Sequence, residues 1–212
     1  MDQSLSQYGE RPIDRLARLG ILGPQTLAVH AVALDDHDIA TLARHNTHIA
    51  HCPTANLKLA SGIARTNDLQ KAGINIGLGT DGAAGNNRLD LLGEARLAGL
   101  LAKGTSGDAS TLPAHALIYM ATLGGARALG LADRIGSLEP GKQADLCAIR
   151  LDSPATLPVF DAASHILYAA GREHVTDVWV AGESVVKKKQ LVRISYEEVY
   201  VRAKTWENRL RG

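Results

Sequence analysis

The sequence has little cysteine, no surplus of one charge and no long apolar run. Only two cysteines occur in 212 residues, Cys52 and Cys147, and they lie far apart. Their scarcity excludes a disulfide-rich scaffold and favours a reducing compartment, with both thiols packed rather than paired or bound to a metal. The net charge is +1 and the longest basic run is residues 187–189, so nothing favours a nucleic-acid partner.

Membrane-spanning and secretory segments are also missing. No apolar run approaches the roughly 18 residues that a membrane span needs, and residues 1–20 are polar and charged, unlike a signal peptide. We therefore expect a cytoplasmic protein with no membrane partner. Apolar residues make up 45% of the chain and charged residues 21%, which is typical of a soluble globular protein with a buried core.

A strand, a turn and a helix recur three times in the first hundred residues. Apolar runs at 26–32, 47–53 and 74–81 predict the strands. The helix behind the Asp-rich segment has Ile39, Leu42 and Ala43 on one face. Strands that alternate with helices are typical of parallel βα units, either in a doubly wound sheet or in part of a barrel. Further helices are predicted near residues 11–19, 63–72, 88–103 and 111–129.

The pattern changes after Leu131. Residues 135–149 are rich in turns and lead into a strand, and residues 175–194 predict a hairpin around 181–183. Helical periodicity returns at the end of the chain. We therefore divide the chain into an α/β part (1–131), a small β-rich part (132–194) and a terminal helix (195–212). One face of that helix carries Tyr196, Val199, Tyr200, Ala203, Trp206 and Leu210.

Groups that bind metals or move protons follow each of the predicted strands. In parallel βα folds, active groups stand at the C-terminal ends of strands, and these ends offer His30, His51 and Asp81. Imidazole and carboxylate are the usual ligands of a hydrolytic metal site, and histidine shuttles protons near neutral pH. The spacing therefore allows a catalytic site at this edge of the sheet.

Each of these residues also has a purely structural interpretation. A single histidine at a strand end is often a structural residue, and Asp81 before glycine can cap the following turn. Asn86 and Asn87 can cap the helix predicted at 88–103, and for Asn87 we favour that role.

Three segments, "AHCPTANLKLASG", "GTDGAAGNN" and "GSLEPGKQADL", carry a resemblance to a known family. Together they resemble the amidohydrolase superfamily, and within it the branch of 5-methylthioadenosine/S-adenosylhomocysteine deaminases and related triazine hydrolases. "NLKLASG" followed by a strand that ends in "GTDGAA" favours the adenosine-type deaminases. The family pattern usually has serine where this chain has Gly85.

The resemblance implies a distorted (β/α)₈ barrel with a small β-sandwich and one divalent metal, typically zinc. The three predicted strands would be the sixth, seventh and eighth strands of the barrel. Asp81 then matches the aspartate that binds the metal and takes the proton of the attacking water. His30 matches the histidine that hydrogen-bonds that water or the developing oxyanion. Substrate contacts are expected from Asn56, Gly82 and Ala83. The small residues Gly79, Gly82 and Ala83 would let a purine ring approach the end of the strand.

Other parts of the family pattern are missing. The sequence contains no His-x-His, and no histidine precedes His30. The resemblance therefore implies the C-terminal half of a metal-dependent hydrolytic deaminase of adenosine-type thioether nucleosides, inactive as an isolated half. Guanine, cytosine and triazine hydrolases of the same branch remain alternatives. So does a non-catalytic fragment that needs a complementary chain. Open strand edges predict a homo-oligomer or pairing with an N-terminal half.

Overall fold

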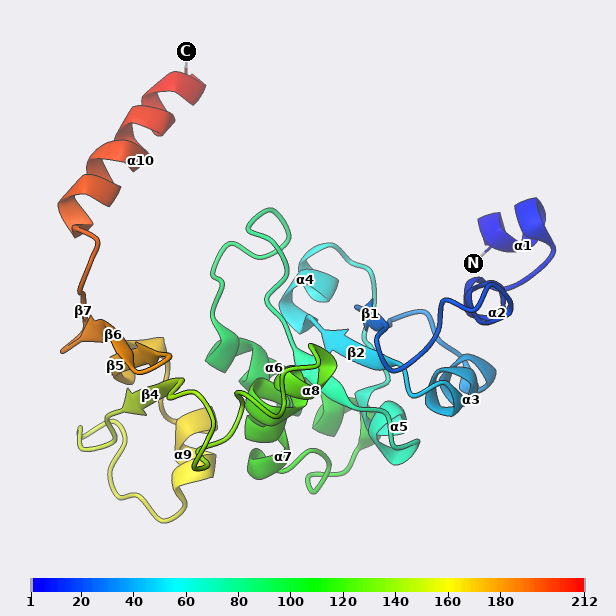
Figure 1. The fold of residues 1–212 in the computed structure, drawn as a ribbon, viewed down its shortest axis with the longest axis horizontal. Helices are drawn as coiled ribbons and strands as arrows, with labels where there is room; N and C mark the ends of the chain where they lie inside the picture. The colour runs from blue at the N-terminus through cyan, green and yellow to red at the C-terminus, as the bar shows by residue number, and fades with distance from the viewer. Residues whose placement is uncertain (1, 212) are drawn as a thin grey trace.

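The structure is a computed structural model that describes residues 2–211. Within these residues, a parallel sheet lies in the first part of the chain and an antiparallel sheet in the second (Figure 1). The first part contains α1 (Asp2–Tyr8), α2 (Pro12–Arg18), β1 (Leu27–Val29), α3 (Asp36–Arg44), β2 (His48–His51), α4 (Pro53–Lys58), α5 (Thr66–Lys71), β3 (Ile76–Leu78), α6 (Leu91–Ser106), α7 (Ala114–Tyr119), the π-helical turn η1 (Met120–Gly124) and α8 (Gly125–Ala128).

The parallel sheet has the order β1-β2-β3, so the C-terminal ends of its strands meet at one edge. Each strand is shorter than its apolar run predicts. After β1, His30 and Ala31 take left-handed backbone angles, with φ of 72° and 52°, and a strand cannot continue through them. Asp81, beyond β3, is also left-handed, with φ of 62°. These turns place the predicted site residues just outside the sheet.

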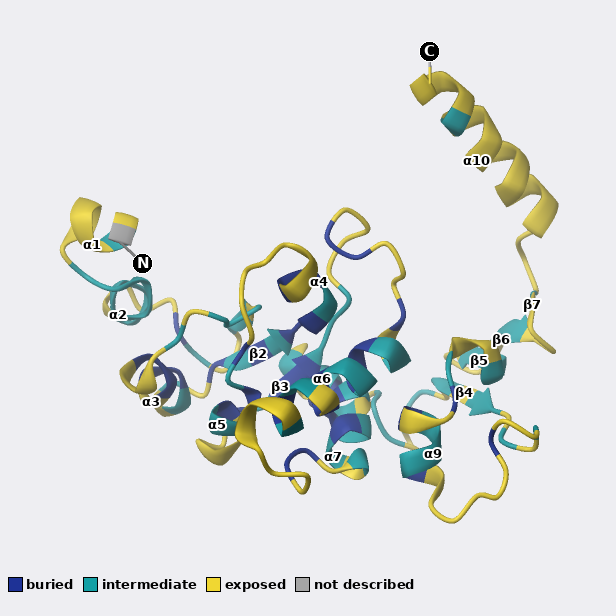
Figure 2. Cartoon of the chain, turned by 180° about the vertical axis from the view of Figure 1, so that it is seen from behind, coloured by how far each residue is buried: buried dark blue, intermediate teal, exposed yellow. Residues whose placement is uncertain are grey.

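Apolar side chains from the helices and the parallel sheet form one core, which is the darkest region of Figure 2. The predicted apolar face of α3 is confirmed, because Ile39 and Leu42 are buried in this core. Asp35 caps α3 by accepting a hydrogen bond from the backbone of Asp38 at 2.9 Å. Other core residues include Ile49, Leu69, Ile76, Ala95, Ala98, Leu112, Leu117 and Leu167.

Two predictions for local structure were wrong, and a third was confirmed in part. The polar segment after Pro53 is not a loop but α4, with proline at the start of the helix, where its missing N–H costs nothing. The helix predicted at 111–129 is interrupted by the π-helical turn η1. Asn87 does not cap α6: the helix begins at Leu91, and the Asp90 carboxylate accepts from the Gly93 N–H at 3.0 Å.

The antiparallel sheet has the order β4-β5-β6-β7 and contains the predicted hairpin as β5 and β6. Cys147 on β4 is exposed, so the prediction of a packed thiol was wrong for this residue and right for the buried Cys52. Helix α9 was not predicted. The second part contains β4 (Leu146–Ile149), α9 (Ala162–Tyr168), the 3₁₀ turn η2 (Arg172–His174), β5 (Val175–Val180), β6 (Glu183–Lys187), β7 (Gln190–Leu191) and α10 (Tyr196–Arg211).

Helix α10 extends away from the rest of the chain (Figure 1). The predicted helix is confirmed within residues 196–211, whereas residue 212 lies outside the described range. Its apolar face has no partner in this part of the chain, and Trp206 and Tyr200 are 61% and 62% exposed. No helix among residues 2–211 is long and apolar enough to cross a membrane.

Candidate active site at the ends of the parallel strands

His30 and Asp81 lie together, although they follow different strands. His30 Nε2 is 3.9 Å from Asp81 Oδ2, and the two side chains are 39% and 33% exposed. The other carboxylate oxygen, Oδ1, accepts a hydrogen bond from the Gly82 N–H at 2.6 Å. Because 3.9 Å exceeds a hydrogen bond, the imidazole and the carboxylate are not bonded to one another, and both are partly open to solvent.

Asn56 is the hydrogen-bond partner of His30. It lies on α4, is 2% exposed, and its Oδ1 is 2.8 Å from His30 Nδ1. The Asn56 Nδ2 has no partner among the described residues. The imidazole of His30 is therefore held between a buried amide on one side and Asp81 on the other.

His51 ends β2 in a closed environment. It is 1% exposed, and within residues 2–211 neither ring nitrogen has a hydrogen-bond partner. Burial, with a contribution from nearby His30, lowers the pKa of His51 to about 4. Next to it, burial raises the pKa of the Cys52 thiol, and the Asp81 carboxylate raises it further. His51 is therefore a neutral imidazole at neutral pH.

The small residues around Asp81 fall into two groups, those that pack closely against other residues and those that face open space. A Cβ at Gly85 would lie 2.8 Å from Asp81 Oδ2, and a Cβ at Gly79 would lie 3.0 Å from Cys52 Sγ. Both glycines therefore allow close packing within the chain. Gly82 has nothing within 4 Å of such a Cβ, and Ala83 is exposed beside it. Open space for a ligand thus lies at Gly82 and Ala83.

Glu94 is a structural residue of the site that the sequence did not reveal. It lies on α6, is 2% exposed, and its Oε2 accepts from the Thr54 N–H at 3.0 Å. Its Oε1 accepts from Asn86 Nδ2 at 2.7 Å. Thr54 lies in the first turn of α4, where backbone N–H groups lack partners within the helix. Glu94 thus joins α4, which carries Asn56, to the loop that carries Asp81.

Replacing this carboxylate is expected to destabilise the protein. Each carboxylate oxygen of Glu94 accepts one hydrogen bond, from Thr54 or from Asn86. In Glu94→Gln, an NH₂ group replaces one of these oxygens, so one of the two N–H donors loses its acceptor. Such a loss costs about 1–3 kcal/mol, and urea unfolding of both proteins measures it. Glu197→Gln on the exposed α10 is the matched control, with an expected change close to zero. An unchanged unfolding midpoint for Glu94→Gln would show that the hydrogen bonds of Glu94 do not stabilise the fold.

The described residues do not form a complete metal site. No group of three or more His, Cys, Asp or Glu side chains within residues 2–211 is arranged to hold an ion. The Asp81 side chain is partly exposed and can supply one carboxylate ligand. Since a catalytic zinc normally has three protein ligands, the remaining ligands would have to come from outside this part of the chain.

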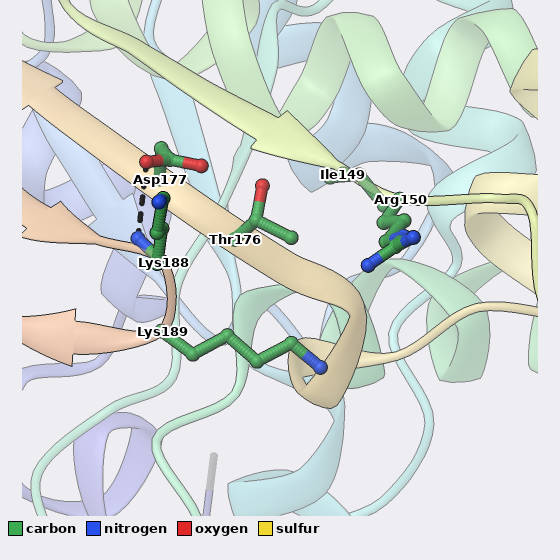
Figure 3. Close-up of a pocket in the computed structure, with 6 residues that line it drawn as sticks. All are labelled: Ile149, Arg150, Thr176, Asp177, Lys188 and Lys189. Atoms are coloured by element: carbon green, nitrogen blue, oxygen red, sulfur yellow. Dashed lines mark hydrogen bonds between the residues drawn. The ribbon is translucent and has the colours of Figure 1, made fainter.

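A second hollow lies on the antiparallel sheet, away from the strand ends (Figure 3). Arg150 pairs with Asp152 at 2.6 Å, and the Asp177 carboxylate accepts from the backbone N–H of Lys188 at 3.1 Å. The lining also contains Ile149, Thr176 and Lys189. None of these residues is among the candidate site residues predicted from the sequence.

Comparison with known protein families identifies the family of this chain. The model of the amidohydrolase family matches residues 2–185. The chain belongs to the amidohydrolase family. This confirms the resemblance found in the sequence, and a mixed α/β fold is shared with solved amidohydrolases. Two of these contain zinc, which supports a divalent metal in the family.

The similar amidohydrolases are about twice as long as this chain. Two 5-methylthioadenosine/S-adenosylhomocysteine deaminases, from Teredinibacter turnerae and Moorella thermoacetica, are 45% and 44% identical over 210 and 195 residues. The matches cover 99% and 92% of this chain but 48% and 46% of these relatives. The chain thus spans about half the length of the curated relatives it matches, and it corresponds to their C-terminal half.

Two solved structures have the same arrangement of elements. An adenosine deaminase from Xanthomonas campestris with bound zinc has a TM-score of 0.96 at 44% identity, over 99% of this chain and 48% of that chain. An atrazine chlorohydrolase from Arthrobacter aurescens complexed with zinc has a TM-score of 0.90 at 30% identity, over 95% and 45% of the two chains.

Proposed function

We propose that this chain supplies half of the active site of a metal-dependent hydrolytic deaminase for adenosine-type thioether nucleosides. In this proposal, β1, β2 and β3 are the sixth to eighth barrel strands, and residues 132–194 are part of a β-sandwich. A complementary barrel half provides the remaining metal ligands. The relatives named 5-methylthioadenosine/S-adenosylhomocysteine deaminase support this substrate class.

The observation that carries the proposal is the meeting of His30 and Asp81. Two groups that follow different strands face one another across 3.9 Å, beside the open surface of Gly82 and Ala83. The Gly82 N–H holds one oxygen of Asp81 and leaves the other free to act. Deamination needs such an arrangement, because a proton acceptor must lie beside the attacking water.

The chain's own residues account for part of the reaction. Water adds to the ring carbon that carries the 6-amino group. Asp81 accepts the proton that the water loses and returns it to the amine, which leaves as ammonia. His30 holds the water or the adduct by a hydrogen bond at Nε2. A divalent metal, when bound at Asp81, supplies Lewis acidity that lowers the pKa of water. Gly82 and Ala83 leave room for the purine, and a group from the complementary half protonates the ring nitrogen.

A second candidate function is a non-catalytic fragment. The incomplete donor set favours it for the chain alone, since Asp81 provides a single ligand. Guanine, cytosine or triazine hydrolysis is the other alternative, and the similarity to the atrazine chlorohydrolase favours the triazine.

A chimera tests the proposal directly. It joins the N-terminal half of the Teredinibacter turnerae relative to this chain, and it is loaded with zinc. We expect ammonia release from 5′-methylthioadenosine and S-adenosylhomocysteine, and little from guanine or cytosine. The intact relative is the positive control. A folded chimera that retains zinc but releases no ammonia from these nucleosides would contradict the proposal.

The chain alone is expected to bind zinc weakly. Its described residues offer Asp81 without two further ligands, and three or more are needed for tight binding. Metal analysis after dialysis against a chelator should therefore find far less than one zinc per chain. Stoichiometric zinc that survives this treatment would reveal a complete site within the chain.

A further inference from the structure

We propose that Asn56 is a positioning residue that fixes the tautomer of His30, with the proton on Nδ1 and the lone pair on Nε2. The assignment of a role in catalysis rests on the proposed function, whereas the tautomer itself does not. The sequence suggested that Asn56 contacts the substrate. The structure favours an effect through His30, because the amide is buried and its oxygen is 2.8 Å from the imidazole.

The amide oxygen can only accept a hydrogen bond, so the nitrogen that faces it must carry the proton. In a neutral imidazole only one nitrogen is protonated. His30 Nε2, on the side of Asp81, is therefore left as an acceptor. A neutral His30 with this tautomer accepts a hydrogen bond from water in the site and cannot donate one to an oxyanion.

The position of Asn56 is itself fixed by the fold. Its backbone N–H donates to the Cys52 carbonyl at 3.0 Å, and its carbonyl accepts from the Ser61 N–H at 2.8 Å. The first turn of α4 is held by the Glu94 carboxylate through Thr54. The backbone of Asn56 is therefore held in place, and its side-chain oxygen is the partner that the structure gives to His30 Nδ1.

Nitrogen-15 NMR of the whole chain, labelled at histidine and free of metal, tests this inference. Near pH 9 histidine side chains are neutral, and the spectra distinguish a protonated ring nitrogen from an unprotonated one. His30→Gln identifies the His30 signals. We expect Nδ1 of His30 to be protonated in wild type. We also expect Asn56→Asp to retain this tautomer, because a carboxylate oxygen also accepts from Nδ1.

Asn56→Ala removes the acceptor and should shift the His30 ring to the tautomer mixture of an exposed histidine. His115, which is 83% exposed, provides that reference in the same spectra. A wild-type His30 with its proton on Nε2 would overturn the inference, and so would an unchanged tautomer in a folded Asn56→Ala. If the alanine variant does not fold, wild type and Asn56→Asp still decide. The spectra need no substrate, so an inactive chimera would leave this inference standing.

Discussion

In the zinc-loaded chimera, Asp81→Asn should lower the rate of ammonia release by a factor of about 10²–10⁴. The amide keeps the shape of the side chain and can still accept from the Gly82 N–H, but it cannot take a proton from water at neutral pH. Its weaker hold on a metal adds to the loss. Steady-state release of ammonia from 5′-methylthioadenosine measures the effect.

Two variants serve as comparisons for Asp81→Asn. The exposed Asp133→Asn makes the same chemical change away from the strand ends and should retain the wild-type rate. His30→Gln should slow turnover by a smaller factor, because in the proposed function His30 contacts the water or adduct without binding the metal. If Asp81→Asn turned over its best nucleoside at the wild-type rate, the assignment of Asp81 as proton acceptor would be wrong.

The second large effect is a loss of stability in mild acid, caused by His51. Its pKa is about 4 in the folded chain because of burial and nearby His30, against about 6.5 in an unfolded chain. The unfolded state therefore binds a proton first as the pH falls. The stabilisation is fully present above about pH 6.5 and is lost as the pH falls toward 4. Linkage gives a loss of about 2 kcal/mol between pH 7 and pH 5.

Urea unfolding at the two pH values measures this loss, and His51→Leu isolates its origin. Leucine removes the titrating group without breaking a hydrogen bond, because neither ring nitrogen has a partner in residues 2–211. The variant should lose much less stability than wild type over the same interval. His115→Gln, at an exposed position, should behave like wild type. Equal losses in wild type and His51→Leu would assign the pH dependence to other groups.

Sequence patterns predicted the elements whose apolar residues repeat regularly. The parallel strands, α3 and the hairpin of β5 and β6 follow from such repeats. Helix α4 could have been found, since proline commonly begins a helix, but its polar residues suggested a loop. The interruption of the helix at η1 and the position of α9 depend on packing between distant segments, which local patterns do not contain.

The proximity of His30 and Asp81 was predictable from the sequence, but most of the contacts around them were not. The rule that active groups follow parallel strands indicated His30 and Asp81. The bond between His30 and Asn56 joins a strand end to a helix that was predicted as a loop. Glu94 gave no signal, because a glutamate on a helix rich in leucine and alanine usually faces solvent. Its two buried hydrogen bonds appear only in the folded chain.

At His30 and Asp81, the left-handed backbone opposes the stability of the fold to the catalytic role that we propose for these residues. Residues other than glycine at such angles cost of order 1–3 kcal/mol each, somewhat less for aspartate. Glycine at either position would relieve that cost and remove the reactive group. In a chain with no catalytic role, replacement of His30 or Asp81 by glycine would therefore increase stability. Selection of variants for thermal stability alone should replace these two side chains early, whereas selection that includes turnover of the chimera should retain them.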